Sequence, residues 1–285
     1  MNAIPYIKML RPHQWLKNLM LLFPPFLGGA LFDPGILQKA IIPFASFCLA
    51  SSVSYLFNDL LDRERDARHP TKKNRPIASG VVSSRVAIVF ILILLVLSIG
   101  AAILVSSTFL EFIGIYLLLS FLYSRKLKEL PVVDIFCISA GFLIRLEAGG
   151  AAFGIIISEW LFLSVFLLAL FLSTGKRLHE KRLLGDSAAG HRQALEEYPE
   201  GFLDGTMYLT GGAVLVTYTM YVISRHTLAF TVPLCCFGLL RFIFRVKSGE
   251  GGDPTESLLG DPQLFAVGLA WAIMIAWGIY GRGGM

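Results

Sequence analysis

Long runs of apolar residues dominate this sequence and restrict it to folds that a lipid bilayer can hold. Only 16% of its 285 residues are charged, whereas about 25% are charged in a typical soluble domain. A run of about 20 apolar residues can cross a bilayer as a helix. We therefore predict an all-α integral membrane protein, organised as a single domain over 1–285. The nine apolar segments that predict nine transmembrane helices are 19–32, 38–58, 85–105, 108–124, 133–155, 159–175, 205–224, 227–245 and 262–281.

The basic residues predict how the chain is oriented in the membrane. If the gaps between the spans are numbered alternately, the set that includes the N-terminus holds 21 of the 25 Lys and Arg. The opposite set holds only Lys39, Arg225 and Arg282. Because basic loops stay on the cytoplasmic side, we predict a cytoplasmic N-terminus, an external C-terminus and a location in the cell membrane. The long charged cytoplasmic loops are where we expect the functional site.

The most informative polar motif closes the second apolar segment and reads Asn58-Asp59-Leu-Leu-Asp62-Arg-Glu-Arg-Asp66. In a helix, positions i, i+3 and i+7 share a face, so Asp59, Asp62 and Asp66 should lie on one side. Three neighbouring carboxylates repel one another, and Mg²⁺ is a hard cation that binds carboxylates together with substrate phosphates. We predict that the three aspartates bind Mg²⁺ and, through it, a diphosphate. The alternative is a solvated face whose carboxylates pair with Arg63, Arg65 or Arg68.

A charged residue inside an apolar segment is the second strong signal. Arg145 lies in the fifth segment, eleven residues beyond Asp134, and the two share a helix face. A charge inside a membrane costs a few kcal/mol and is a functional hypothesis by default. We predict that Arg145 faces a polar cavity that opens to the cytoplasm, and the alternative is a structural pair with a buried acid.

Further polar residues at the cytoplasmic boundaries are candidates for holding phosphate groups. The alternative explanation in each case is the anchoring of a basic loop at the membrane surface. The last cytoplasmic loop, over 249–262, is acidic, and its spacing assigns it no role. The boundary candidates are Lys73 and Arg75 after the Asp motif, Tyr123, Lys126 and Lys128 after the fourth segment, and Lys176, Arg177 and Glu180 after the sixth.

Taken together, these motifs resemble the UbiA superfamily of intramembrane transferases. Within it, the sequence is more similar to the branch that acts on decaprenyl phosphate with a phosphoribosyl donor. The resemblance implies nine helices around a central cavity that opens to the cytoplasm. It is carried by Arg11-Pro-His-Gln-Trp-Leu-Lys17-Asn18, the Asp motif, Asn74-Arg75-Pro-Ile-Ala-Ser-Gly80, Tyr123-Ser-Arg-Lys-Leu-Lys128, Gly141-Phe-Leu-Ile-Arg145 and Gly175-Lys176-Arg177-Leu-His-Glu180.

One departure distinguishes the branches of the superfamily. Members that use prenyl diphosphates carry a second DxxxD motif after the sixth helix, whereas this chain has Lys176-Arg177-Leu-His-Glu180 there. A basic site suits a phosphate monoester better than a second magnesium diphosphate. The resemblance therefore implies Mg²⁺-dependent transfer of 5-phosphoribose from phosphoribosyl diphosphate to a polyprenyl phosphate, with inversion at C1. The alternatives are prenyl transfer to an aromatic acceptor and, in a different class, a transporter.

The resemblance also implies roles for individual residues. Asn58, Asp59 and Asp62 would be catalytic, and Asp59, Asp62 and Asp66 would bind the metal. We expect membrane lipids around the protein and no nucleic-acid partner, and the oligomeric state stays open. The residues expected to contact substrate are Lys17, Asp66, Lys73, Arg75, Tyr123, Lys126, Lys128, Asp134, Arg145, Lys176, Arg177 and Glu180.

Overall fold

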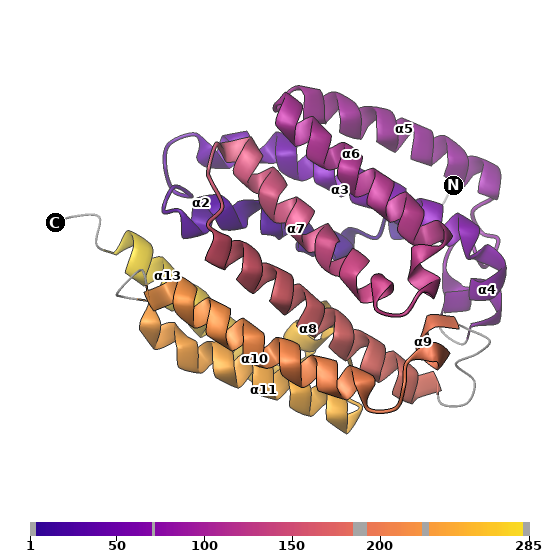
Figure 1. Ribbon diagram of the computed structural model, residues 1–285. Helices are drawn as coiled ribbons and strands as arrows, with labels where there is room; N and C mark the ends of the chain where they lie inside the picture. The colour runs from indigo at the N-terminus through magenta and orange to yellow at the C-terminus, as the bar shows by residue number, and fades with distance from the viewer. Residues whose placement is uncertain (1–3, 70–71, 185–192, 224–227, 282–285) are drawn as a thin grey trace. The chain divides into compact units, whose positions relative to one another are not determined.

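The computed structural model describes residues 4–69, 72–184, 193–223 and 228–281, and every regular element within them is a helix. This confirms the all-α prediction (Figure 1). The predicted external positions Arg225 and Arg282 lie outside the described residues. The longer helices are α3 (Ile36–Leu61), α5 (Ser84–Ile103), α6 (Ser107–Arg125), α7 (Val133–Phe153), α8 (Glu159–Leu184), α10 (Phe202–Ile223), α11 (Val232–Ser248) and α13 (Pro262–Tyr280). The shorter ones are α1 (Ile4–Leu10), η1 (Pro12–Leu22), α2 (Phe23–Leu27), α4 (Arg63–Arg68), η2 (Lys72–Asn74), η3 (Leu127–Glu129), α9 (Gln193–Glu197), η5 (Ala229–Thr231) and α12 (Pro254–Gly260).

Eight helical segments in the described part of the chain are long and apolar enough to cross a membrane. They match eight of the nine predicted segments. The main difference is the sixth, which was expected to end near 175 and continues as a span to Leu183. The charged residues from Lys176 to Arg182 therefore extend a helix and do not form a loop.

The first predicted segment, 19–32, is not among the eight. It is divided between η1, a 3₁₀-helix, and the five-residue helix α2. Proline has no N–H to donate and restricts the residue before it, and Pro24 and Pro25 fall in this stretch. Gly29 follows with a φ of 82°, a left-handed conformation that ends the helix. A ninth spanning helix is therefore not confirmed.

The chain divides into two compact units, and α7 contributes to both. Unit 1 contains α3, α5 and α6, and unit 2 contains α8, α10, α11 and α13. Unit 1 comprises Met1–Pro25, Ala30–Lys128 and Ile144–Ile156, and unit 2 comprises Phe26–Gly29, Glu129–Leu143 and Ile157–Met285.

In unit 1, α3 packs against both α5 and α6 (Figure 1). Two serines join α3 to α5 directly: Ser46 Oγ donates to the carbonyl of Ser98, and Ser98 Oγ donates to the carbonyl of Ser46, each at 2.9 Å. Both serines are fully buried. Hydrogen bonds of this kind and close packing hold helices together where lipid supplies no hydrophobic driving force between them.

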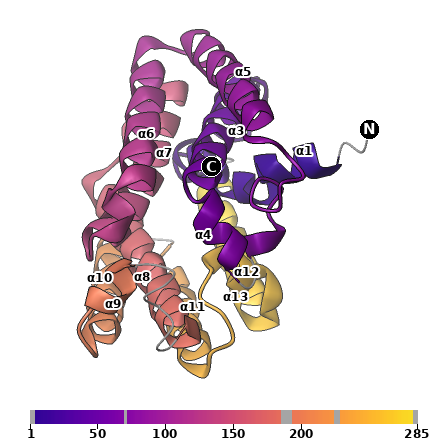
Figure 2. The same ribbon diagram turned by 90° about the vertical axis from the view of Figure 1, so that its right-hand side faces the viewer.

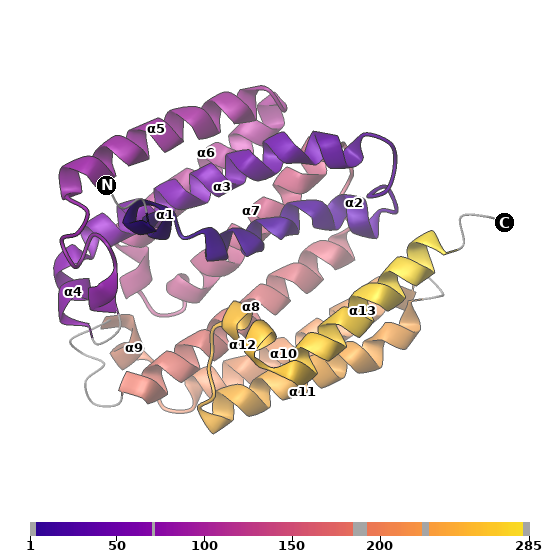
Figure 3. The same cartoon turned by 180° about the vertical axis from the view of Figure 1, so that it is seen from behind.

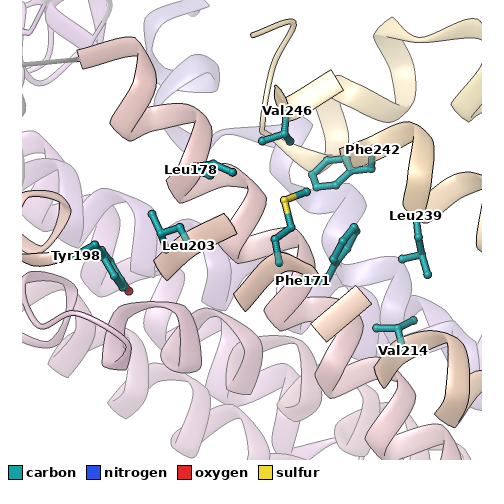
Figure 4. Close-up of a cluster of buried hydrophobic side chains, with 9 residues drawn as sticks. Phe171, Leu178, Tyr198, Leu203, Val214, Leu239, Phe242 and Val246 are labelled. Atoms are coloured by element: carbon teal, nitrogen blue, oxygen red, sulfur yellow. The ribbon is translucent and has the colours of Figure 1, made fainter. Parts of the chain in front are cut away.

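In unit 2, α10 packs along α8, and α11 packs against α13 (Figure 3). The short helix α12 lies at the start of α13, as Figure 2 shows. Gly175 allows close packing in this unit, since a Cβ at that position would collide with the ring of Phe242. A buried hydrophobic cluster of this unit is drawn in Figure 4 and contains Phe171, Leu178, Tyr198, Leu203, Met207, Val214, Leu239, Phe242 and Val246.

Gly149 in α7 tests the packing of unit 1. A Cβ there would lie 3.0 Å from Leu21 Cα and closer still to the Leu21 carbonyl oxygen. A backbone cannot move aside as a side chain can, so we expect Gly149→Ala to lower the free energy of unfolding by about 1–3 kcal/mol. Gly114→Ala in α6 is the matched control, because nothing lies within 4 Å of its Cβ position. Equal stability of the two variants in a denaturant titration would contradict the tight contact.

Candidate functional site

The three aspartates of the Asp motif lie where α3 gives way to α4. Asp59 is in the last turn of α3, Asp62 joins the two helices, and Asp66 is in α4. The Asp66 amide donates to the carbonyl of Asp62 at 2.7 Å, so the helical path is nearly continuous. Asp59 and Asp66 are 2% and 5% exposed. Burial of two carboxylates this close in sequence requires cationic or hydrogen-bonding partners.

Those partners come from three distant parts of unit 1. Arg11 Nη2 contacts Asp59 Oδ1 at 2.5 Å. Arg75 Nη1 lies 3.1 Å from the same oxygen and 2.5 Å from Asp66 Oδ2, so it joins two carboxylates. Lys128 Nζ lies 2.6 Å from each oxygen of Asp62. These three cations are not the arginines Arg63, Arg65 and Arg68 of the alternative explanation.

Lys128 also settles which lysine near Tyr123 reaches the Asp motif. Its Nζ lies 3.3 Å from the amide oxygen of Asn58 in addition to its bonds with Asp62, and the residue is 6% exposed. Lys126, by contrast, is exposed, and Tyr123 is partly buried. Whether these residues contact a substrate stays a prediction.

Arg11 is a member of the site that the sequence-based prediction omitted. Its backbone is left-handed, with a φ of 54° and a ψ of 57°, which is uncommon outside glycine. Such conformations cost about 1–3 kcal/mol and cluster at functional sites. The guanidinium lies over the Tyr55 ring, 5.1 Å from its centroid. The only signal in the sequence is the position of Arg11 at the start of the N-terminal motif.

The oxygen donors at this site suit magnesium by their chemistry. The carboxylates of Asp59, Asp62 and Asp66 and the amide of Asn58 are hard oxygen ligands of the kind that Mg²⁺ binds. No group of three His, Cys, Asp or Glu in the described ranges is arranged as a ready metal shell. Each of the three aspartates is bonded to a cation, and a metal would have to displace at least some of those bonds.

Arg145 lies deep in α7 and is 5% exposed. Its Nε donates to Asn18 Oδ1 at 2.8 Å, and its Nη2 donates to the Tyr116 hydroxyl at 3.0 Å. Asn18 donates in turn to Ser51 Oγ at 3.2 Å. The arginine is therefore held by a polar network that joins α7 to η1, α6 and α3. A cavity in front of Arg145 stays a prediction.

In unit 2, Arg177 is enclosed by acidic partners and is 2% exposed. Its Nε donates to Asp134 Oδ2 at 2.6 Å, and its Nη1 donates to Glu180 Oε2 at 2.8 Å. Asp134 is fully buried. These three residues were predicted to contact substrate, and the structure brings them together as a buried ion network. A role for them in binding a phosphate stays a prediction.

Tyr198 completes this network, and the sequence-based prediction missed it. Its hydroxyl donates to Asp134 Oδ1 and accepts from the Val132 amide, both at 2.6 Å. Burial, with the hydrogen bond to Asp134, raises the pKa of the Tyr198 phenol, so it remains a neutral donor. Val132 has a φ of 67°, a strained value for a β-branched residue. Tyr198 thus fixes the strained start of α7.

The acidic loop over 249–262 docks on the end of α8. Asp253 accepts from the amides of Thr255 and Glu256 as the N-cap of α12, and it lies 2.7 Å from Lys176 Nζ. A Cβ on Gly252 would collide with His179 in α8. Unlike Arg177, Lys176 is 41% exposed at its side chain. The loop, for which the sequence indicated no role, therefore holds the exposed lysine of the pair.

The loop ends at Asp261, a fully enclosed carboxylate that caps α13. Arg241 Nη2 and Arg245 Nη1 each lie 2.7 Å from its Oδ2, and its Oδ1 accepts from the Leu264 amide. These hydrogen bonds lower the pKa of the Asp261 carboxyl, and the bond from Arg241 has the largest effect. Asp261 therefore ties both arginines of α11 to the start of α13.

We expect Asp261→Asn to lower the free energy of unfolding at pH 7 by about 2 kcal/mol, because hydrogen bonds to a charged group are lost. Asn still caps a helix, so the change isolates the charge. The pKa is lowered on folding, so the wild-type advantage is complete above pH about 4 and disappears as the pH falls through the lowered pKa. Denaturant titrations of both proteins at several pH values test this. A difference that grew with acidification would contradict it.

Two further predicted residues lie in the 3₁₀-helices of unit 1. Lys17 is partly buried in η1, and Lys73 is exposed in η2. The structure brings Asn58, Asp59, Asp62, Asp66, Arg75 and Lys128 together in unit 1, and Asp134, Arg177 and Glu180 together in unit 2.

Comparison with known proteins places these observations in context. The model of the UbiA prenyltransferase family matches residues 21–267. The decaprenyl-phosphate phosphoribosyltransferase of Corynebacterium glutamicum is 35% identical over 96% of this chain and 86% of that protein. The enzyme of the same name from Mycobacterium tuberculosis is 35% identical over 93% of this chain and 91% of its own. A UbiA homologue from Archaeoglobus fulgidus, solved with GPP and Mg²⁺, is 22% identical with a TM-score of 0.73, over 96% of this chain and 98% of that one. This last similarity concerns the fold.

Proposed function

The chain belongs to the UbiA prenyltransferase family, and from that premise we propose that it moves 5-phosphoribose from phosphoribosyl diphosphate to a polyprenyl phosphate. The reaction breaks the bond between C1 of the ribose and the diphosphate and forms a bond from C1 to a phosphate oxygen of the lipid, with inversion at C1. The relatives named for this reaction cover almost the whole chain at 35% identity. The lipid phosphate that we propose as acceptor is decaprenyl phosphate.

One observation carries the choice of a phosphoribosyl donor over a prenyl donor. Where prenyl-diphosphate users of the family carry a second Asp motif, α8 presents Lys176 on its surface and Arg177 bonded to Asp134. One carboxylate, Glu180, remains there, and it already pairs with Arg177. Lys176 is the more exposed of the two cations, and it suits a phosphate monoester that would replace Asp253 as its partner. Prenyl transfer to an aromatic acceptor is therefore the less favoured function.

We propose that Asp59, Asp62 and Asp66, with Asn58, hold Mg²⁺ and through it the leaving diphosphate. The metal would neutralise the negative charge that develops as the diphosphate departs. Arg75 and Lys128 are bonded to these carboxylates and are placed to bind diphosphate oxygens. No strong general base is required, because the attacking lipid phosphate is already ionised.

The remaining substrate contacts are proposals for the phosphates of the two substrates. Lys73 or Arg75 would hold the 5-phosphate of the ribose, and Lys17, Arg145 and Lys176 would contact the other phosphates. Tyr123 and Lys126 lie beside Lys128 in the sequence and would contribute at the same boundary. Asp134 of α7 and Arg177 and Glu180 of α8 form one ion network, and these three residues would contact a substrate phosphate beside Lys176.

The chain is a multi-pass membrane protein of this family. We propose that 1–285 works as one transferase domain with nine helices around a cavity open to the cytoplasm. The N-terminus would be cytoplasmic and the C-terminus external, in the cell membrane. The distribution of Lys and Arg supports this orientation. Cysteine labelling of single positions in intact cells, one in α4 and one in the turn between α5 and α6, would test it.

A parallel assay tests the proposed reaction. Purified protein in lipid receives radiolabelled phosphoribosyl diphosphate or prenyl diphosphate, each with either decaprenyl phosphate or an aromatic acid, in the presence of Mg²⁺. We expect labelled lipid only from the phosphoribosyl donor with decaprenyl phosphate. Transfer from the prenyl donor alone would overturn the proposal in favour of the alternative.

A further inference from the structure

We propose that Arg11, Arg75 and Lys128 are internal counterions of the Asp motif, and that a divalent cation and a diphosphate displace them together. Arg11 then becomes a diphosphate-binding residue, a role that neither the motif nor the proposed reaction assigned to it. The inference rests on the proposed function only in requiring a metal and a diphosphate at this site. It predicts that the two ligands bind with positive coupling that this chain's own cations create.

The ion pairs show that the Asp motif already has counterions within the protein. Arg11, Arg75 and Lys128 together bond all three aspartates at 2.5–3.1 Å. Three positive and three negative side chains leave the cluster without net charge. A divalent cation that arrives alone must therefore compete with the cation already bonded to each carboxylate.

The three cationic side chains are also largely shielded from water. The side chains of Arg11, Arg75 and Lys128 are 17%, 26% and 7% exposed. A cation that loses its carboxylate in such surroundings is left poorly hydrated, and breaking one side of a buried pair is costly. Binding of the metal alone is therefore weakened, because it leaves these cations without an anionic partner.

A diphosphate removes that cost. Its oxygens are strong acceptors for guanidinium and ammonium groups, and arginine matches them with two parallel N–H bonds. The displaced cations exchange carboxylate oxygens for phosphate oxygens and remain paired. Each ligand thereby makes room for the other, and the coupling must be equal in both directions.

Arg11 is the member best suited to a test. It contacts a single carboxylate, that of Asp59, whereas Arg75 bridges two. Its left-handed backbone and its contact with Tyr55 hold the guanidinium at the Asp motif. Replacing Arg11 by Gln removes a counterion and leaves the metal-binding oxygens in place.

The experiment measures Mn²⁺ binding to the full-length protein in detergent by electron paramagnetic resonance, with and without inorganic diphosphate, at matched free Mn²⁺. For wild type we expect weak binding alone and much tighter binding with diphosphate. For Arg11→Gln we expect Mn²⁺ alone to bind roughly tenfold more tightly, which corresponds to about 1.4 kcal/mol. The gain from added diphosphate should shrink by a similar factor.

Two matched variants complete the design. Arg63→Gln makes the same change near Asp62, but Arg63 donates to Ser84 Oγ, so its binding should equal that of wild type. Arg11→Lys keeps the charge and should restore wild-type binding of Mn²⁺ alone. Should Arg11→Gln fail to fold by circular dichroism, Arg75→Gln replaces it with the same expectation.

The outcomes separate this inference from the proposed reaction. Unchanged or weaker binding of Mn²⁺ alone to Arg11→Gln, with undiminished coupling, would overturn the counterion exchange and leave phosphoribosyl transfer standing. Conversely, the expected binding pattern with transfer only from a prenyl donor would support the exchange and sink the proposed reaction. No transfer assay enters the binding result, so the two failures cannot be confused.

Discussion

Asp62→Asn is expected to lower the rate of phosphoribosyl transfer by about 100- to 1,000-fold. That is the order of loss seen when one electrostatic partner of a developing charge is removed. Asp62 is the most exposed of the three aspartates, 18% at its side chain, and its two oxygens are both bonded to Lys128. The amide keeps the shape of the side chain and loses its negative charge. The initial rate of labelled lipid formation at saturating Mg²⁺ measures the effect.

The control for this prediction is Asp33→Asn, the same change in the turn before α3. Asp33 is exposed and lies outside the Asp motif, so we expect its rate to match wild type. Thermal unfolding of both variants should stay close to wild type, which separates lost chemistry from lost structure. Full transfer activity in Asp62→Asn would refute the role of the Asp motif in holding the diphosphate.

The second large effect is expected on stability, in unit 2. Asp134→Ala leaves the guanidinium of Arg177 buried without one of its two carboxylate partners, and Tyr198 loses its acceptor. Removing one side of a buried ion pair costs about 3–5 kcal/mol. We expect a loss of this size in the free energy of unfolding, measured by denaturant titration in detergent.

A double variant and an exposed pair provide the controls. Asp134→Leu with Arg177→Leu removes both charges and should cost less than the sum of the two single changes, because neither charge is stranded. Asp204→Ala breaks partly exposed pairs with Lys247 and Arg182 and should cost less than about 1 kcal/mol. If the loss of unfolding free energy in the double variant equalled the sum of the two single losses, the ion network between Asp134 and Arg177 would be contradicted.

The same double variant distinguishes a structural role from a binding role. If the pair only supports α8, a folded double variant should retain most of its transfer activity at high substrate concentration. If Arg177 binds a phosphate directly, the folded protein should require much more substrate or be inactive. The KM for each substrate, measured beside kcat, decides between these roles.

The sequence by itself determined the class of fold and the family, and it singled out the Asp motif as the candidate site. A helix satisfies its backbone hydrogen bonds within one segment, as an apolar run of about 20 residues in a bilayer requires. Eight of the predicted segments are helices of the expected length. The i, i+3, i+7 spacing placed Asp59, Asp62 and Asp66 together because it depends only on helical geometry. The family followed from motifs that can be read directly in the printed residues.

Only the tertiary structure decided which charges meet. Arg11 and Asp59 are 48 residues apart and Lys128 and Asp62 are 66 apart, and no local pattern encodes such contacts. The same limit explains why Tyr198 was missed and why Lys176 and Arg177, adjacent in sequence, differ so much in exposure. Successive residues on a helix point about 100° apart, so one faces the interior and its neighbour does not. Which face is interior depends on the helices packed around it, and that is a property of the folded chain.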